Sequence, residues 1–416
     1  MKKKIRLGIF GLTRGSAFFP AIVKEGGELV AVCEKNESRV KQAQEKYDFS
    51  NVAIYDDVEK FIEHDMDAVL LCNYFCEHAE YAIRFLEKGI HVLSECQSNV
   101  TMAEGVALVR AAEKSKAKYV LLENYPFMLF NLEMKKLYDE GTLGKALYCE
   151  GEYNHPGKRD YWTTRWLYNS EKHWRRYLPR TYYLTHSLAP LMYITGARPK
   201  RVSAFPIFHP SENSHVMVGD IGSVMTTLND DDSVFRFMGH TSFGGEENSY
   251  RFCCEKGQME NVRGTEGKIM LTYNEWEKPQ DKEKTNFYMP DWLPEDKEIA
   301  SQMGHFGGDY FVFKEFFAVI RGEKENVFDE YFATTLASTA ILAHRSQLEK
   351  GVPYDIPDFR KEEDRKKWEN DTLTPFWGKN GEEPTIPCCS RPDYRPTEQA
   401  LAWFRNAMDG KNPDEN

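Results

Sequence analysis

A glycine-containing segment near the N-terminus has the residue types that bind a pyrophosphate. The run GIFGLTRG at residues 8–15 joins the apolar stretch 5–10 to a helical pattern at 16–24. At such a junction, backbone N–H groups and the helix dipole favour an anion, and glycines let the backbone approach it. The middle glycine of G-x-G-x-x-G is absent, so an ordinary strand–helix turn is the alternative. The pattern predicts a dinucleotide site with contacts from Gly8, Gly11, Leu12, Thr13 and Arg14.

An acidic residue follows the second apolar stretch, where it can select the cofactor. Glu34 comes directly after residues 29–33. A carboxylate at this point accepts hydrogen bonds from the adenosine ribose and repels a 2′-phosphate, which favours NAD over NADP. Lys35 beside it weakens this preference, and a solvated loop acid is the alternative reading.

Three residues in the second half have side chains suited to proton transfer. His186 lies in a Thr-His-Ser-Leu-Ala-Pro segment that begins a helical pattern, and imidazole titrates near neutral pH. Tyr153 ends a strand-like segment, and a phenol, with a pKa of about 10 in water, needs a neighbouring cation to act as a base. His155 falls on the same face of a strand as Tyr153. We predict catalytic roles for all three; a helix-capping histidine and a packed aromatic are the alternatives.

The segment 159–180 combines aromatic and arginine side chains. Aromatic rings stack on sugar faces, and arginine binds hydroxyl groups or carboxylates. An interface or core loop has the same composition, so that alternative stays open. We expect no metal, because the histidines show no zinc-type spacing. The alternative is a metal at which His155, His173, His186 and His305 converge. The predicted substrate contacts are Tyr125, Trp162, Trp166, Arg175, Arg176 and His305.

The elements that must position these residues differ between the two parts of the chain. Up to residue 125, short apolar strands alternate with helices, which predicts a parallel sheet with right-handed crossovers, a Rossmann dinucleotide-binding domain. The predicted strands cover 5–10, 29–33, 52–54, 68–72, 91–94 and 119–122, and the helices 16–24, 37–47, 58–64, 76–88 and 101–114. Segments at the ends of these strands supply further predicted cofactor contacts at Asn73, His78, Glu95, Cys96 and Asn124. For Asn73 and His78, helix capping is the alternative.

Residues 126–416 predict a second domain, of α+β class with a large, mainly antiparallel open sheet. Strand-like segments lie at 146–153, 202–207, 222–227, 234–241, 250–254 and 267–273. Helical patterns lie at 129–140, 183–194, 308–321, 331–350 and 398–408. The polar segment 274–298 predicts a surface excursion.

The composition excludes several classes of function. The net charge of −11 and the lack of a long basic run argue against nucleic acid as a partner. No stretch approaches the roughly 18–20 apolar residues of a membrane span, and the N-terminus does not resemble a signal peptide. The nine cysteines include adjacent pairs but no metal-type C-x-x-C, so we expect a cytoplasmic protein with reduced thiols.

Several motifs resemble the Gfo/Idh/MocA family of sugar oxidoreductases. They are Asp67–Cys72, His78 and Gly89–Glu95. The resemblance implies an NAD-binding Rossmann domain, a carbohydrate substrate, and a C-terminal sheet domain used for substrate binding and homo-oligomer contacts, in a dimer or tetramer. Dehydrogenases of the family carry Glu-Lys-Pro, whose lysine serves the substrate hydroxyl. Here the triplet is Glu95-Cys96-Gln97, and a cysteine cannot supply that ammonium group.

Within this superfamily, the second half is most similar to the NAD-dependent α-N-acetylgalactosaminidases. The similar segments are 152–155, 184–190, 263–267 and 304–309, with Leu184 and Ser187 replacing a proline and a glycine of that branch. The acids of the usual dehydrogenase motif are also missing, with Tyr182 and Ala189 in their places. This resemblance implies glycoside cleavage by transient oxidation at C3 of the sugar. A simple NAD-dependent sugar or polyol dehydrogenase and a non-catalytic sugar or cofactor sensor are the alternatives.

Overall fold

The structure is a computed structural model that describes residues 4–157, 171–210 and 217–409. It forms two compact units. The first comprises Met1–Leu129, Asp291–Ala337 and Asp358–Asn370, and the second Phe130–Pro290, Ser338–Pro357 and Asp371–Asn416. The expected boundary at residue 125 lies near the end of the first segment of this unit. It does not account for Asp291–Ala337 and Asp358–Asn370, which also belong to the first unit. Helix α11 (Gly308–Ile320) explains the return, since it packs on α2 (Phe19–Lys24) and the Phe18 and Phe313 rings lie 4.7 Å apart.

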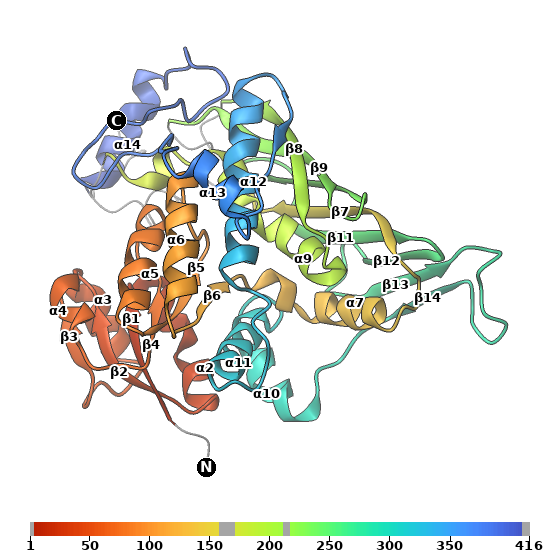
Figure 1. Cartoon of the computed structure of the whole chain (residues 1–416), viewed down its shortest axis with the longest axis horizontal. Coiled ribbons are helices and arrows are strands. Elements are labelled where there is room, and N and C mark those ends of the chain that lie inside the picture. Colours follow the sequence, from red (N-terminus) through yellow and green to blue (C-terminus); the bar gives the residue numbers. More distant parts are fainter. Residues whose placement is uncertain (1–3, 158–170, 211–216, 410–416) are drawn as a thin grey trace. The chain divides into compact units, whose positions relative to one another are not determined.

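The first unit is built on a six-stranded parallel sheet in the order β3-β2-β1-β4-β5-β6 (Figure 1). This is the order of a Rossmann fold, whose direction reverses between β1 and β4. The predicted α/β class is thus confirmed. The strands are β1 Ile5–Phe10, β2 Gly27–Cys33, β3 Ala53–Tyr55, β4 Ala68–Leu71, β5 His91–Glu95 and β6 Tyr119–Leu122.

The helices of the first unit follow the sequence pattern with some differences. Helix α6 has the expected capping box, in which Thr101 Oγ1 accepts from the Glu104 N–H at 3.2 Å and the Glu104 carboxylate accepts from the Thr101 N–H at 3.0 Å. The first helix begins at Leu12 instead of residue 16, and α10 and α13 were not predicted. The remaining helices are α1 Leu12–Gly15, α3 Glu37–Gln44, α4 Val58–Ile62, α5 His78–Glu87, α6 Met102–Lys114, α10 Pro294–Gln302 and α13 Glu362–Trp368.

The second unit contains a nine-stranded sheet in the order β14-β13-β12-β11-β7-β10-β9-β8-β15. All neighbouring strands are antiparallel except β7 and β10, so the predicted mainly antiparallel sheet is confirmed. The segment predicted as a surface excursion contains β14, which extends the sheet. The strands are β7 Ala146–Asn154, β8 Pro199–Phe208, β9 Asp220–Asn229, β10 Val234–His240, β11 Glu247–Cys254, β12 Gly257–Asn261, β13 Ile269–Tyr273, β14 Thr285–Tyr288 and β15 Tyr354–Asp355.

Helix α9 (Thr185–Thr195) is buried and contacts β7, β10 and β11. Figure 1 shows it beside β7 and β11. Two glycines permit the close approach. A Cβ on Gly151 would lie 2.1 Å from the Ser187 carbonyl oxygen, and one on Gly239 would lie 2.1 Å from a methyl carbon of Leu184. The other helices are α7 Leu129–Asp139, α12 Glu330–Leu348 and α14 Glu398–Met408. Among the described residues, no helix has the length and apolar character needed to cross a membrane.

Candidate functional site

The glycine turn of the first unit has the packing that a dinucleotide fold requires. Gly11 has φ 93°, and a Cβ there would lie 2.4 Å from the Cys72 carbonyl oxygen, so only glycine lets the turn approach the end of β4. Gly15 packs against Ile9, as the last glycine of the fingerprint does. Gly8 lies inside β1, and its missing Cβ makes room for Met66 and Phe61. The structure therefore places Gly8, which was predicted to contact the cofactor, in the packed core of the first unit.

Glu34 stands where the sequence analysis placed it, at the carboxyl end of β2 beside this turn. One carboxylate oxygen accepts from the Leu12 N–H at 2.9 Å, and the other accepts from the Asn36 N–H at 3.0 Å. Each oxygen keeps a second lone pair for a ribose hydroxyl. Thr13 contacts Arg39 through its hydroxyl. The arrangement holds the Glu34 carboxylate in one orientation next to the start of α1.

Asn73 and His78 follow β4 and carry buried polar atoms with no protein partner in the described chain. These atoms are both side-chain atoms of the Asn73 amide and Nε2 of His78. Burial lowers the pKa of His78, so the ring is neutral, donates from Nδ1 to the Gln97 carbonyl oxygen at 2.9 Å and keeps Nε2 as an acceptor. Buried polar atoms are costly unless something completes their hydrogen bonds. These residues therefore fit a bound polar cofactor at the point where the strand order reverses.

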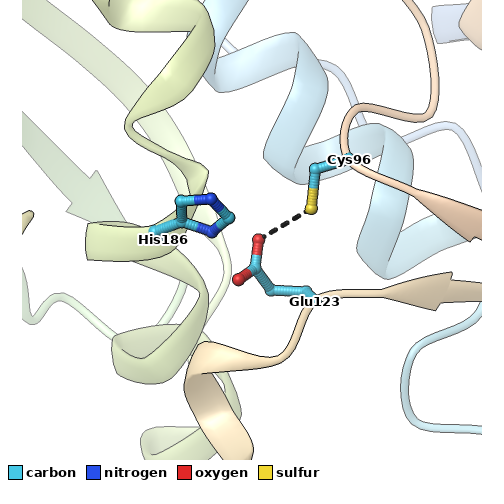
Figure 2. A group of neighbouring side chains, drawn as sticks. All are labelled: Cys96, Glu123 and His186. Carbon is cyan, nitrogen blue, oxygen red and sulfur yellow. Dashed lines mark hydrogen bonds between the residues drawn. The ribbon is translucent and has the colours of Figure 1, made fainter. Parts of the chain in front are cut away.

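A thiol and a buried carboxylate lie together just after β5 and β6. Cys96, just after β5, donates from Sγ to Glu123 Oε2 at 2.9 Å, and Glu123 is fully buried at 0% exposure. Figure 2 shows the Cys96 and Glu123 side chains pointing toward one another. Glu123 was missed by the sequence analysis. Its signal was an acid directly after the buried strand 119–122.

Arg14 is held by two carboxylates of the first unit. Its Nε donates to Glu95 Oε1 at 2.9 Å, and its terminal nitrogens donate to both oxygens of Asp309 at 2.7 and 3.1 Å. Burial alone would raise the pKa of Asp309, but the Arg14 charge and the hydrogen bond from His305 hold it well below its usual range. Arg14 therefore ties the glycine turn to Glu95 and Asp309. Asp309 is a second residue that the sequence analysis missed.

The Asp309 carboxylate also reaches two predicted site residues. It accepts from Asn124 Nδ2 at 2.7 Å and from His305 Nδ1 at 3.1 Å. The His305 ring lies 5.6 Å from the ring of Tyr125. The structure thus brings the predicted residues Arg14, Asn124, Tyr125 and His305 into one cluster.

In the second unit, the predicted proton-transfer residues lie together. The Tyr153 ring meets the His186 ring edge-on at 4.9 Å, and Tyr183 meets the same imidazole at 5.3 Å. Tyr153 and His186 are only 6% and 9% exposed. The Tyr250 hydroxyl donates to the His186 carbonyl oxygen at 2.8 Å and fixes the start of α9. The Tyr153 and His186 side chains are therefore in contact and almost completely shielded from solvent.

His155 joins this group at its edge. Its ring lies 5.9 Å from that of Tyr153, and its Nδ1 lies 3.1 Å from the exposed carboxylate of Glu246. Glu246 therefore orients His155, which lies just beyond β7.

The two predicted arginines point in different directions. Arg175 lies over the rings of Trp174 and Tyr183, at 4.4 and 5.6 Å, and so belongs to the tyrosine–histidine group. Arg176 lies 3.7 Å over the Phe404 ring and donates to the Glu171 carbonyl oxygen, which ties it to α14 instead. Trp162 and Trp166 lie outside the described residues.

A third missed residue is Arg180. It is buried and donates to the Leu178 carbonyl oxygen at 3.0 Å. Burial, together with the charge of Arg175, lowers its pKa to about 10, while Tyr183, Tyr153 and Asp220 act in the opposite direction. Its charge therefore interacts electrostatically with both tyrosines. Its only sequence signal was membership of the arginine-rich segment 159–180.

Comparison with known proteins agrees with this arrangement. Residues 5–123 match the family model for the NAD-binding Rossmann fold of the oxidoreductase family, and residues 131–260 match that for the GFO/IDH/MocA C-terminal domain. The chain belongs to the Gfo/Idh/MocA family. The Rossmann domain of this family binds NAD. This agrees with the position of Glu34 and with the buried polar atoms of Asn73 and His78 that have no hydrogen-bond partner in the described chain. Residues 209–369 also match the C-terminal domain of glycosyl hydrolase 109.

Relatives of this Gfo/Idh/MocA chain include glycosyl hydrolase family 109 proteins. A glycosyl hydrolase family 109 protein of Bacteroides fragilis is 30% identical over 204 residues, which cover 45% of this chain and 42% of the relative. The chain thus matches less than half the length of that relative. A glycosyl hydrolase family 109 protein of Shewanella sp. is 22% identical over 410 residues, covering 88% of this chain and 87% of the relative.

Solved structures share the fold. A levoglucosan dehydrogenase in complex with NADH and levoglucosan has a TM-score of 0.72 at 16% identity, covering 85% of this chain and 100% of the other. An aldose–aldose oxidoreductase of Caulobacter crescentus has a TM-score of 0.67 at 18% identity, with the same coverage. At these identities the likeness concerns the fold alone.

Proposed function

We propose that the chain is an NAD-dependent enzyme that cleaves a glycoside by transient oxidation at C3 of the sugar. The observation that carries the proposal is the pair formed by Tyr153 and His186. A simple alcohol dehydrogenase needs one base, for the hydroxyl proton. Cleavage through a ketone needs a second, for the neighbouring C–H. The similarity to glycosyl hydrolase 109 proteins supports the same conclusion.

The residues of the second unit take the proton-transfer roles. His186 accepts the proton of the C3 hydroxyl as that carbon loses hydride and becomes a ketone. Tyr153 then removes the acidified proton at C2, the C1–O bond breaks, and the leaving oxygen takes a proton. Water adds at C1 with return of a proton to C2. Hydride returned to C3, together with the proton held by His186, restores the hydroxyl. The net change is hydrolysis of one glycosidic bond.

Neighbouring side chains support these roles. The buried charge of Arg180 interacts electrostatically with Tyr153 and Tyr183. Glu246 orients His155 beside Tyr153, and Arg175 with Trp174 offers a charged and an aromatic surface to a sugar.

The first unit would hold NAD through Glu34, Asn73, His78 and the turn at Gly11. When bound, NAD⁺ supplies the hydride acceptor and its reduced form the donor, so it is needed but not consumed. The Cys96–Glu123 pair replaces a lysine that family dehydrogenases use for the substrate hydroxyl. We assign the corresponding proton transfer to His186.

The experiment that tests this proposal measures aglycone release from a panel of α- and β-aryl glycosides, with and without trace NAD⁺, while NADH absorbance is followed. We expect release that depends on catalytic NAD⁺ and leaves no net NADH. Steady NADH formation from a free sugar or polyol without aglycone release would reject the proposal and identify a simple dehydrogenase. Cofactor binding without either reaction would identify a sensor.

A further inference from the structure

The cluster around Arg14 contains more negative than positive charge. Arg14 bonds to both Glu95 and Asp309, and one guanidinium against two carboxylates leaves a net charge of −1. Asp309 is 3% exposed in its side chain and accepts four hydrogen bonds, from Arg14 twice, Asn124 and His305. These donors keep its carboxylate ionised. Among Arg14, Glu95 and Asp309, the carboxylates therefore outnumber the guanidinium group by one.

The cluster lies at the carboxyl ends of the strands that serve the nicotinamide half of a dinucleotide. Arg14 follows β1, Glu95 ends β5, and Asn124 follows β6. In a sheet of this order the cofactor lies outside the carboxyl ends of the strands and crosses where the order reverses. Glu34, at the end of β2, marks the adenosine half. The other half therefore falls on the side of β4, β5 and β6.

We propose that this excess charge makes the first unit bind NAD⁺ in preference to NADH, and that Asp309 is the positioning residue that sets the preference. The nicotinamide ring carries a positive charge when oxidised and none when reduced. A neighbouring negative charge therefore stabilises the oxidised form selectively. The proposal rests on NAD binding and not on the identity of the sugar. Such a preference would keep NAD⁺ bound between turnovers in an enzyme that returns its hydride to the substrate in each cycle.

Two variants change the cluster charge in opposite directions. Asp309→Asn removes a negative charge, and Arg14→Met removes the positive one. A unit charge acting over on the order of 10 Å, at an effective dielectric constant of about 20 to 40, changes a binding constant by roughly fourfold to sixteenfold. Asp309→Asn should lower the ratio of Kd for NADH to Kd for NAD⁺ by about this factor, and Arg14→Met should raise it. Loss of a merely structural contact would weaken both cofactor forms alike.

Asp296→Asn is the matched control. Asp296 is a second buried carboxylate of the same unit, and it accepts from the Tyr310 hydroxyl at 2.9 Å and pairs with Lys314 at 2.5 Å. The same hydroxyl oxygen lies 2.8 Å from Glu25 Oε1, at the end of α2 and away from the carboxyl ends of the strands. Removing this charge should leave the ratio unchanged. Arg14→Lys, which keeps the charge, should also stay near the wild-type ratio.

The experiment determines both dissociation constants for the cofactor-free full chain, by calorimetry for NAD⁺ and by fluorescence for NADH, at one salt concentration. Opposite shifts in Asp309→Asn and Arg14→Met support the proposal. An unchanged ratio, or shifts of the same sign, would overturn it. Should Asp309→Asn fail to fold, Glu95→Gln makes the same change of charge at a more exposed side chain. Because no sugar is present, failure of glycoside cleavage would leave this result unaffected.

Discussion

Substitution of Gly151 by alanine tests how precisely α9 must be placed. The new Cβ would lie 2.1 Å from the Ser187 carbonyl oxygen, whereas real Cβ atoms essentially never come closer than 3.0 Å. The difference, 3.0 − 2.1, requires a displacement of at least 0.9 Å between Gly151 of β7 and Ser187, the residue that follows His186. Misplacement of about 1 Å can cost on the order of 10²-fold in rate. We therefore expect kcat for glycoside cleavage to fall roughly 100-fold.

The assay compares this variant with Gly245→Ala. Gly245 lies in the same unit, and its Cβ would meet nothing within 4 Å. Overpacking should lower the free energy of unfolding of Gly151→Ala by about 1–3 kcal/mol, while Gly245→Ala should stay near wild type. NAD⁺ affinity should be unchanged in both, because the cofactor residues belong to the first unit. Full activity and stability in Gly151→Ala would refute the view that contact with β7 sets the position of His186.

Three further predictions follow from individual contacts. Tyr153→Phe keeps the packed ring but loses the hydroxyl, so cleavage should fall about 10²- to 10⁴-fold with little change in thermal stability; a wild-type rate would remove Tyr153 from the mechanism. Glu34→Gln should weaken NAD⁺ binding and raise the relative affinity for NADP⁺, because the repulsive carboxylate is gone; titration of both cofactors measures this, and an unchanged affinity ratio would contradict it. Burial lowers the pKa of His344 to about 4, so the unfolded chain binds a proton that the folded state excludes. The stability that neutral His344 contributes should be complete above about pH 6.5 and fall by about 3 kcal/mol toward pH 4. The free energy of unfolding, measured by denaturant titration at several pH values in this range, should change less with pH in His344→Asn than in the wild type. The same pH dependence in both proteins would exclude this contribution from His344.

Local sequence patterns were sufficient for most of the first unit. Apolar strands such as 68–72 and the Thr101–Glu104 capping box are encoded by neighbouring residues, and the structure contains both. The return of 291–337 to this unit was not predictable, because it depends on contacts such as Phe18 with Phe313 that are distant in sequence. Strand β14 was missed because its polar flanks resemble a loop.

The candidate site shows the same division. Glu34 and His78 were located by their positions after predicted strands, and the structure places both at the carboxyl ends of those strands. Asp309 was missed because its importance comes from Arg14, and the two are joined only by folding. Arg175 and Arg176 are adjacent in sequence, and no pattern indicated that they lie on different rings.

The most direct test of the proposed function is cleavage of a glycoside substrate in D₂O. The proposal predicts that the released sugar carries one non-exchanging deuterium at C2, since the proton removed there is replaced from solvent. The label should appear only with NAD⁺ present and should be lost in Tyr153→Phe. Aglycone release without deuterium at C2 would contradict the account, because direct displacement by two carboxylates leaves that bond intact.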